Sequence, residues 1–501
     1  VLRSLHLASG VLLLLVLATA PEAQTCTTEW AAAASGDWSD DANWTDGAPE
    51  ATDTACITAS GDYVVTLDRT QDLAGLVVGG SSGTQTLAMT GGAITTLGEG
   101  VIGARGLVEI GPAGLREVTG MLTVEGTLVA REGSGLLRGG GTLDVASGGT
   151  LRVRTGNNSV QIGSLPQGQN DPSRIVLRGT LLFDPEGGTA FRTTIDGTLD
   201  LARGTVVLPD GEVFVRGQGR WTGGTFDVAG GGTLRFFGID QTRGTYELSG
   251  TFSGAPSGTV QFDVNAQLAA APGGAAFAVG GAGLGIRGDV PPSTLRSAGG
   301  EFTNTGLLTF SGRADRLAQA VLRNEGTIRI TTNLQLDEGA VLRNVASGVV
   351  DLVGEGDIGT DGSGRFVNEG LLISSGTGRS TLGGALRSQL GSEIRAEAGA
   401  EIQLDPPGAA SVADGTRLTG SGTVRLTQSQ GSLEPDLLIQ GTISPGTEAE
   451  PFATLRTQDW LTFSTLAGNP QLVVDVTSGG MSDLIEHTRN LSPVPGSVRL
   501  A

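Results

Sequence analysis

The Asp and Glu side chains of this sequence are its main candidates for catalysis, as general acids and bases. Two Asp or Glu side chains facing each other across a groove can act as general acid and base on a glycosidic bond. The acidic residues we considered stand singly along the chain: Asp144, Asp184, Asp196, Asp200 and Asp227. Because no two of them share a short motif, we interpret them as solvated turn residues and predict no catalytic residue.

Other catalytic signatures are lacking in the sequence. His487 is the only histidine beyond residue 23, and no Ser or Cys nucleophile motif adjoins it, so we expect it at the surface. The sequence has no phosphate-binding glycine loop, no G-x-S-x-G, no H-E-x-x-H and no CxxC pair. We therefore expect neither an enzyme nor a cofactor.

One acidic, glycine-rich stretch, GEGDIGTDGSG at residues 354–364, is similar to a single copy of a calcium-binding nonapeptide loop. It offers Glu355, Asp357 and Asp361. A calcium ion takes six or more oxygen ligands, and one copy supplies too few. We predict an exposed turn and no metal ligand, with calcium near Asp357 as the alternative left open.

The sequence has two cysteines, Cys26 and Cys56. In an oxidising compartment they are expected to pair, and closing a loop of this length restricts the unfolded chain by about 3.6 kcal/mol in the chain-entropy model. Free or metal-binding thiols are the alternative. No histidine or further cysteine lies near them to complete a metal site.

The elements that would position any site are short repeats. A Gly-Thr pair followed by an apolar residue recurs along the chain, for example at residues 126–128, 149–151, 179–181 and 224–226. Glycine is expected to turn the chain and Thr-Leu to begin a strand. Repeats of this kind indicate a solenoid of short strands.

The clearest register is carried by four asparagines: Asn304, Asn324, Asn344 and Asn368. A step near 20 residues is the size of one β-solenoid coil, so the pattern predicts a right-handed parallel β-helix. Side chains alternate along a strand, which places the apolar residues two positions earlier inside. These are Phe302, Leu322, Leu342 and Phe366. The asparagines are expected to stack in turns with left-handed backbone and to serve a structural role.

Composition agrees with an all-β repeat fold. Glycine makes up 83 of 501 residues and aromatic residues only 4%, which suits short strands and tight turns better than a large aromatic core. The net charge of −20 excludes nucleic acid as a partner, because phosphate binding needs a basic surface.

The chain divides into four segments. Residues 1–23 have the basic, apolar and small-residue regions of a signal peptide, cleaved after Ala23 or after Ala20, and export leaves no membrane span. Residues 24–70 contain both cysteines and Trp30, Trp38 and Trp44, and we interpret them as an N-terminal cap stapled by the disulfide. Residues 71–480 are the β-helix repeats, and 481–501 are the C-terminal end, whether complete or truncated.

The string GDWSDDANWTDGAPEATDTACITASGDYVVTLD resembles the N-terminal W…NW…G.P…D module of bacterial secreted β-strand-repeat proteins, and also a G8-type extracellular domain. Trp38, Asn43, Trp44, Pro49 and Asp53 carry this likeness, together with Gly47. GTISPG at 441–446 and the strand QLVVDV are similar to the closing passage of autotransporter passengers, and the F-x-N-x-G coils to haemagglutinin-like exoproteins. This resemblance implies a secreted or cell-surface β-helix of a bacterium.

Two hypotheses of different class follow. The first is an exported scaffold or adhesin-like rod without catalytic activity, whose partners are a cell-surface or extracellular polysaccharide or protein. The second is a carbohydrate-active β-helix enzyme, a polysaccharide lyase or glycoside hydrolase. An enzyme would bring several carboxylates from adjacent coils into one groove, and a stalk would not. The sequence leaves the ligand, the secretion route and the oligomeric state open.

Overall fold

The computed structural model describes residues 24–426, apart from residues 112–113, 132–134, 137–139, 156–160, 163–172, 186–190, 239–243, 289–291, 384, 406–409, 413–415 and 421. Beyond residue 426 it describes the strand segments 437–439, 444–445, 454–457, 462–463 and 484–487. The predicted signal peptide and most of the predicted C-terminal end therefore lie outside the described residues.

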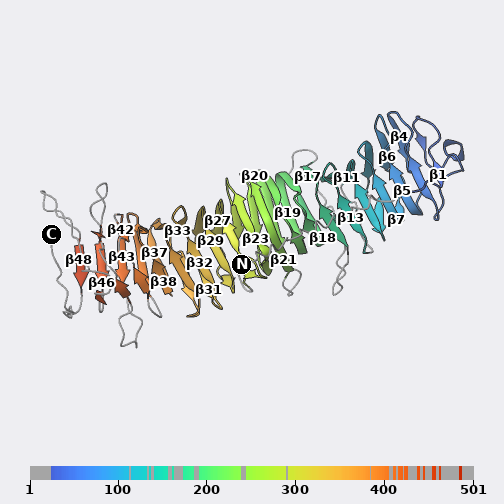
Figure 1. Ribbon diagram of the computed structural model, residues 1–501. Coiled ribbons are helices and arrows are strands. Elements are labelled where there is room, and N and C mark those ends of the chain that lie inside the picture. The colour runs from blue at the N-terminus through green and yellow to red at the C-terminus, as the bar shows by residue number, and fades with distance from the viewer. Residues whose placement is uncertain are drawn as a thin grey trace, which may run out of the picture.

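The expected all-β fold is confirmed as a parallel β-solenoid. Among the described residues, 48 strands form one continuous sheet that coils along a single axis, and every strand pairing is parallel. Figure 1 shows the coils following one another from β1 (Thr28–Glu29) at the blue end to β48 (Leu484–His487) at the red end. One 3-10 turn, η1 (Asp41–Asn43), lies in the first coil. The chain is a rod in which each coil rests on the previous one.

The strands of the N-terminal part are short. They are β2 Gly36–Asp37, β3 Thr54–Ile57, β4 Tyr63–Thr66, β5 Gln71–Val78, β6 Gln85–Met89, β7 Ile94–Ile102, β8 Gly106–Ile110, β9 Leu115–Val118, β10 Met121–Val124, β11 Thr127–Arg131, β12 Gly135–Leu136, β13 Thr142–Val145, β14 Thr150–Thr155, β15 Gln161–Ile162, β16 Arg174–Leu177 and β17 Thr180–Pro185.

Several central strands are longer and bend around a corner of the coil. This part contains β18 Arg192–Leu201, β19 Thr205–Trp221, β20 Gly224–Phe237, β21 Gly244–Gly254, β22 Thr259–Phe262, β23 Ala266–Val279, β24 Leu284–Ile286 and β25 Thr294–Ser297.

The C-terminal coils return to short strands. They are β26 Phe302–Asn304, β27 Leu307–Phe310, β28 Asp315–Ala318, β29 Val321–Asn324, β30 Thr327–Ile330, β31 Asn333–Asp337, β32 Val341–Asn344, β33 Val349–Val353, β34 Asp357–Thr360, β35 Arg365–Asn368, β36 Leu371–Ser375, β37 Gly378–Gly383, β38 Ala385–Ser388, β39 Glu393–Ala396, β40 Ala400–Asp405, β41 Ala410–Val412, β42 Arg417–Thr419, β43 Thr423–Leu426, β44 Leu437–Ile439, β45 Ser444–Pro445, β46 Thr454–Thr457 and β47 Thr462–Phe463.

The interior is a column of apolar side chains, one set from each coil. Phe302 pairs in register with Leu322, Leu322 with Leu342 and Leu342 with Phe366, and all four are at most 3% exposed. The predicted inward stack is therefore confirmed. Burial in register couples each coil to its neighbours, which is the main source of stability in a solenoid.

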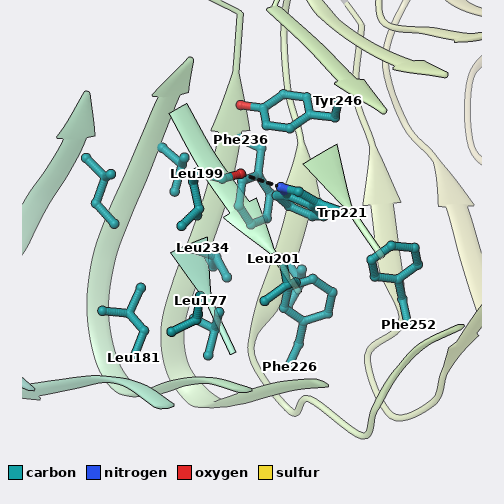
Figure 2. Close-up of a cluster of buried hydrophobic side chains, with 14 of the residues drawn as sticks. Leu177, Leu181, Leu199, Leu201, Trp221, Phe226, Leu234, Phe236, Tyr246 and Phe252 are labelled. Atoms are coloured by element: carbon teal, nitrogen blue, oxygen red, sulfur yellow. Dashed lines mark hydrogen bonds between the residues drawn. The ribbon is translucent and has the colours of Figure 1, made fainter. Parts of the chain in front are cut away.

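Aromatic residues gather in one part of this interior. Trp221, fully buried, contacts the rings of the following side chains: Phe226, Phe236, Tyr246, Phe252 and Phe262. Figure 2 shows Trp221 at the centre of this cluster, with its indole N–H donating to the carbonyl oxygen of Leu199 at 2.8 Å. The scarce aromatic residues thus form a local core where the strands are longest.

The glycines of the Gly-Thr repeat are explained by close approach between coils. A Cβ atom on Gly149 would lie 1.9 Å from the carbonyl oxygen of Val124, and one on Gly179 would lie 2.2 Å from that of Ala146. Neither glycine has a positive φ. At these two positions the repeat therefore needs glycine for space between coils and not for a left-handed backbone.

The disulfide between Cys26 and Cys56 is confirmed, with a Cα–Cα distance of 5.8 Å. It joins the residue two positions before β1 to strand β3, which pairs with β1. Pairing continues across residue 70, since β3 pairs with β5 and β4 with β6. The cap segment is thus built on the first coils of the same stack.

Candidate functional site

The four asparagines found in the sequence form a buried ladder. Each lies at the end of its strand and has no exposed surface. The amide Nδ2 of Asn304 donates to Oδ1 of Asn324, Asn324 to Asn344 and Asn344 to Asn368, each at 2.8 Å. Each amide also donates to a backbone carbonyl of the next coil, such as Val349 for Asn324 at 2.9 Å. The ladder is structural, because all four amide groups donate hydrogen bonds inside the stack.

The backbone at these asparagines differs from the expectation. None of the four has a positive φ, so they are strand residues and not left-handed turn residues. Gly348 provides the necessary space, since a Cβ atom there would lie 2.3 Å from Oδ1 of Asn344. The amide of Asn344 fits because the turn that follows it in the same coil carries glycine.

The interpretation of the five single carboxylates as turn residues is wrong, although Asp227 is solvent-exposed as expected. All five lie in strands, and Asp144, Asp196 and Asp200 are at most 8% exposed. Each of these three pairs with an arginine of the adjacent coil; Arg216, for example, donates to both oxygens of Asp196 at 2.8 and 3.1 Å. The parallel register brings acid and base together over 20 to 34 residues, a relation that local motifs do not reveal.

Two of these carboxylates share one column of the sheet. Asp144 pairs with Val176 and Val176 with Asp200, which sets the two Asp side chains two strand spacings apart, about 9.6 Å. Arg178 binds Asp144 and Arg174 binds Asp200. Burial raises the pKa of Asp144, and the positive charge of Arg178 opposes this shift. This column therefore offers one candidate pair of carboxylates for an acid-base arrangement.

The acidic stretch at residues 354–364 is part strand and part exposed turn, and its carboxylates Asp357 and Asp361 bond to the neighbouring coils. Asp357 begins strand β34, where it accepts the Thr381 N–H at 2.5 Å, and burial raises its pKa. Asp361 accepts the backbone N–H of Glu338 at 2.9 Å and that of Ser363 at 2.8 Å. Within the described residues, no group of three His, Cys, Asp or Glu side chains is placed to hold a metal ion.

The hydrogen bonds to Asp361 predict an acid-sensitive turn. Backbone and side-chain donors, led by the Glu338 N–H, lower the pKa of Asp361 from 3.8 to about 2. Because the folded pKa is the lower one, the stabilisation is present above pH 3.8 and is lost as the pH falls towards 2. The amide resonances of Glu338 and Ser363 should titrate with a midpoint near pH 2 and should not do so in Asp361→Asn. A midpoint near 4 would contradict this assignment.

An outward-facing column of hydroxyl groups follows one corner of the rod. Its members occupy successive coils in direct register and are half-buried: Thr127, Thr150, Thr180, Thr205, Thr225 and Ser253. We call this set the hydroxyl ladder. Neighbouring members are one strand spacing apart, so the ladder extends over roughly 24 Å. Thr225 and Ser253 lie within hydrogen-bonding distance of each other at 3.2 Å.

Two adjoining hollows lie at the end of the hydroxyl ladder. One has a volume of about 400 Å³ and is lined in part by Arg203, Thr225 and Ser253; the other, of about 460 Å³, extends to Glu301. Both share Gly250 and Thr251. Leu248 of β21 pairs with Ala270 of β23, and Gly250 pairs with Ala275. Two residues of β21 thus correspond to five residues of β23, so the corner of β21 at Gly250 is shorter than the corner of β23 beside it. The longer corner projects past the shorter one and leaves the hollows.

Comparison with known proteins gives no family for this chain. No protein-family model matches the sequence, and no curated protein matches it. In the part of the chain that the structure describes, no helix is long and apolar enough to cross a membrane. The assignment of function therefore depends on the fold and on these surfaces.

Proposed function

We propose that this protein is an exported bacterial surface rod that acts as a scaffold or adhesive stalk without catalytic activity. The observation that carries the proposal is the unbroken parallel register, which makes a long and stiff body of regularly spaced coils. A body of this kind can hold a partner away from a surface or bind it through repeated weak contacts. The likeness to autotransporter passengers and haemagglutinin-like exoproteins supports the same function.

The hydroxyl ladder is the contact surface we assign to adhesion. Its hydroxyl groups repeat at the strand spacing and face outward, where each can donate to or accept from the hydroxyls of a linear polysaccharide. Single contacts of this kind are weak, and their number along the ladder raises the overall affinity.

Removing three hydroxyls should therefore weaken binding while leaving the fold intact. In Thr150→Val/Thr180→Val/Thr205→Val, valine keeps the shape and the strand preference. Each lost hydrogen bond is worth about 0.5–1.5 kcal/mol, so retention on insoluble polysaccharides should fall about tenfold or more. Cellulose, chitin and peptidoglycan are suitable for co-sedimentation.

The matched control changes threonines of the same repeat on other faces, Thr142, Thr198 and Thr233, which are also half-buried strand residues. This control should bind as the wild type does. Equal loss in both variants, or no binding to any polysaccharide, would contradict the assignment of the ladder; binding to protein-coated surfaces alone would indicate a protein partner.

A carbohydrate-active enzyme is the second candidate, favoured by the column that holds Asp144 and Asp200. Two carboxylates about 6.5–9.5 Å apart can flank a glycosidic bond with a water between them. In this chain both are clamped by arginines, so we expect no turnover. A polysaccharide panel should be scored for new reducing ends and for unsaturated products absorbing in the ultraviolet. Turnover that disappears in Asp144→Asn or Asp200→Asn would establish the enzyme instead.

A further inference from the structure

The first coil of the rod has an outer edge at which several backbone groups bond to the following residues 38–45. Among the described residues, strand β1 pairs only with β3 and β2 only with β4, so one side of each faces away from the described stack. On that side the N–H of Glu29 donates to Oγ1 of Thr45 at 3.0 Å, and the carbonyl of Glu29 accepts the N–H of Thr45 at 2.9 Å. The N–H of Ala31 donates to the carbonyl of Asn43 at 2.8 Å. Strand β1 therefore offers no free ladder group at these positions.

Side-chain donors satisfy the carbonyls beside β2. The amide Nδ2 of Asn43 donates to the carbonyl of Asp37 at 3.0 Å, and the indole Nε1 of Trp44 donates to that of Trp38 at 2.8 Å. Trp30 Nε1 donates to the carbonyl of Ala34 at 2.9 Å. Asn43 and Trp44 belong to the W…NW pattern of the sequence, and here the pattern acts as a set of hydrogen-bond donors to an edge.

The same segment also closes the apolar interior and reverses the chain direction. Trp30, Trp38 and Trp44 are at most 4% exposed and pack edge to face, with ring centroids 5.1 and 4.7 Å apart. The bridge between Trp30 and Trp44 is antiparallel, whereas the strand pairings of the described chain are parallel. A further parallel coil cannot be added at this end, because the antiparallel segment already bonds to the backbone groups that such a coil would use.

From these contacts we propose that residues 38–45 block a surface that would otherwise bind the strand edge of a second copy of this chain. The groups under the segment are those by which the fold itself adds each coil, so another β edge of the same chemistry fits them. Exposed, regular strand edges associate, and proteins cover them to prevent it. A contact of this kind between copies is independent of the function proposed above, because it involves the end of the rod and not its side.

The test removes the donors and keeps the rings. Asn43→Asp is isosteric and cannot donate when ionised, and Trp44→Phe retains an aromatic ring without the indole N–H. In the full-length double variant, the amides of Glu29 and Ala31 should exchange faster when dilute. The mass measured by light scattering should rise with concentration to about twice the wild-type value or more, because opened edges pair.

Two controls keep the outcome interpretable. Trp221→Phe also removes a buried indole donor, the one to Leu199, but in the middle of the rod, and it should keep the wild-type mass. Asn43→Asp alone should act in the same direction as the double variant if the latter folds poorly. Unchanged exchange at Glu29 and Ala31 would show that these donors do not seal the edge. Faster exchange without a rise in mass would show that the edge does not bind a second copy; either result overturns the proposal.

Discussion

Asn344→Leu is expected to destabilise its coil by about 3–5 kcal/mol, because three buried groups lose their partners at once. Asn344 accepts the Asn324 amide at 2.8 Å and donates to Oδ1 of Asn368 at 2.8 Å and to the carbonyl of Leu371 at 3.1 Å. Leucine can make none of these bonds. A buried donor or acceptor left unpaired costs about 1–3 kcal/mol, which exceeds the gain from the added apolar surface.

The matched control is Asn304→Leu at the end of the same ladder. Asn304 donates to Asn324 and to the carbonyl of Thr327, but its own Oδ1 is buried without a hydrogen-bond partner. Its replacement leaves no orphan donor and removes that orphan acceptor, so it should cost about 1–3 kcal/mol less than Asn344→Leu. Native-state hydrogen exchange across β26, β29, β32 and β35 measures both costs locally. Equal costs would mean that the amide ladder does not act as a chain of bonds.

The asparagine ladder could be predicted because its coils have nearly constant length. Steps of 20, 20 and 24 residues between Asn304 and Asn368 keep one residue type in one column, so periodicity alone places it. The buried stack of apolar residues two positions earlier follows from the alternation of side chains along a strand. The absence of a left-handed turn did not follow, because asparagine is common both in such turns and in stacked strands.

The arginine pairs of the buried carboxylates could not be predicted in the same way. Arg216 and Asp196 are 20 residues apart, whereas Arg178 and Asp144 are 34 apart, although both pairs join adjacent coils. Where loops of different length separate the strands, sequence spacing no longer indicates which residues share a face. A single Asp then resembles a solvated turn, because its arginine partner belongs to another coil.

The hydroxyl ladder could not be predicted from the sequence either, because sequence spacing does not indicate which threonines share a face. Thr142 and Thr150 both follow a glycine and precede a leucine, yet only Thr150 pairs with Thr127 and Thr180. Thr142 pairs with Arg174 on another face. The repeat predicts strand starts, but one coil contains more than one start, so the column requires the three-dimensional register.

Breaking the disulfide is expected to loosen the N-terminal coil and leave the centre of the rod unchanged. The bond closes 30 residues, for which the chain-entropy model gives about 3.6 kcal/mol, and this corresponds to exchange faster by a few hundredfold. The effect should appear at the amides of Glu29, Ala31 and Thr45, which are bonded within this loop or beside it. Mass spectrometry of exchanged peptides can compare wild type, reduced wild type and Cys56→Ser.

Reduced wild type separates the bond from the residue. Cys56 has no exposed surface, so a serine there also buries a hydroxyl, and Cys56→Ser should exchange somewhat faster than the reduced protein. Strands β29, β32 and β35 should exchange alike in all three proteins, because in a solenoid each coil is stabilised mainly by its neighbours. If these strands accelerate together with the first coil, the rod unfolds as one cooperative unit and the disulfide stabilises its whole length.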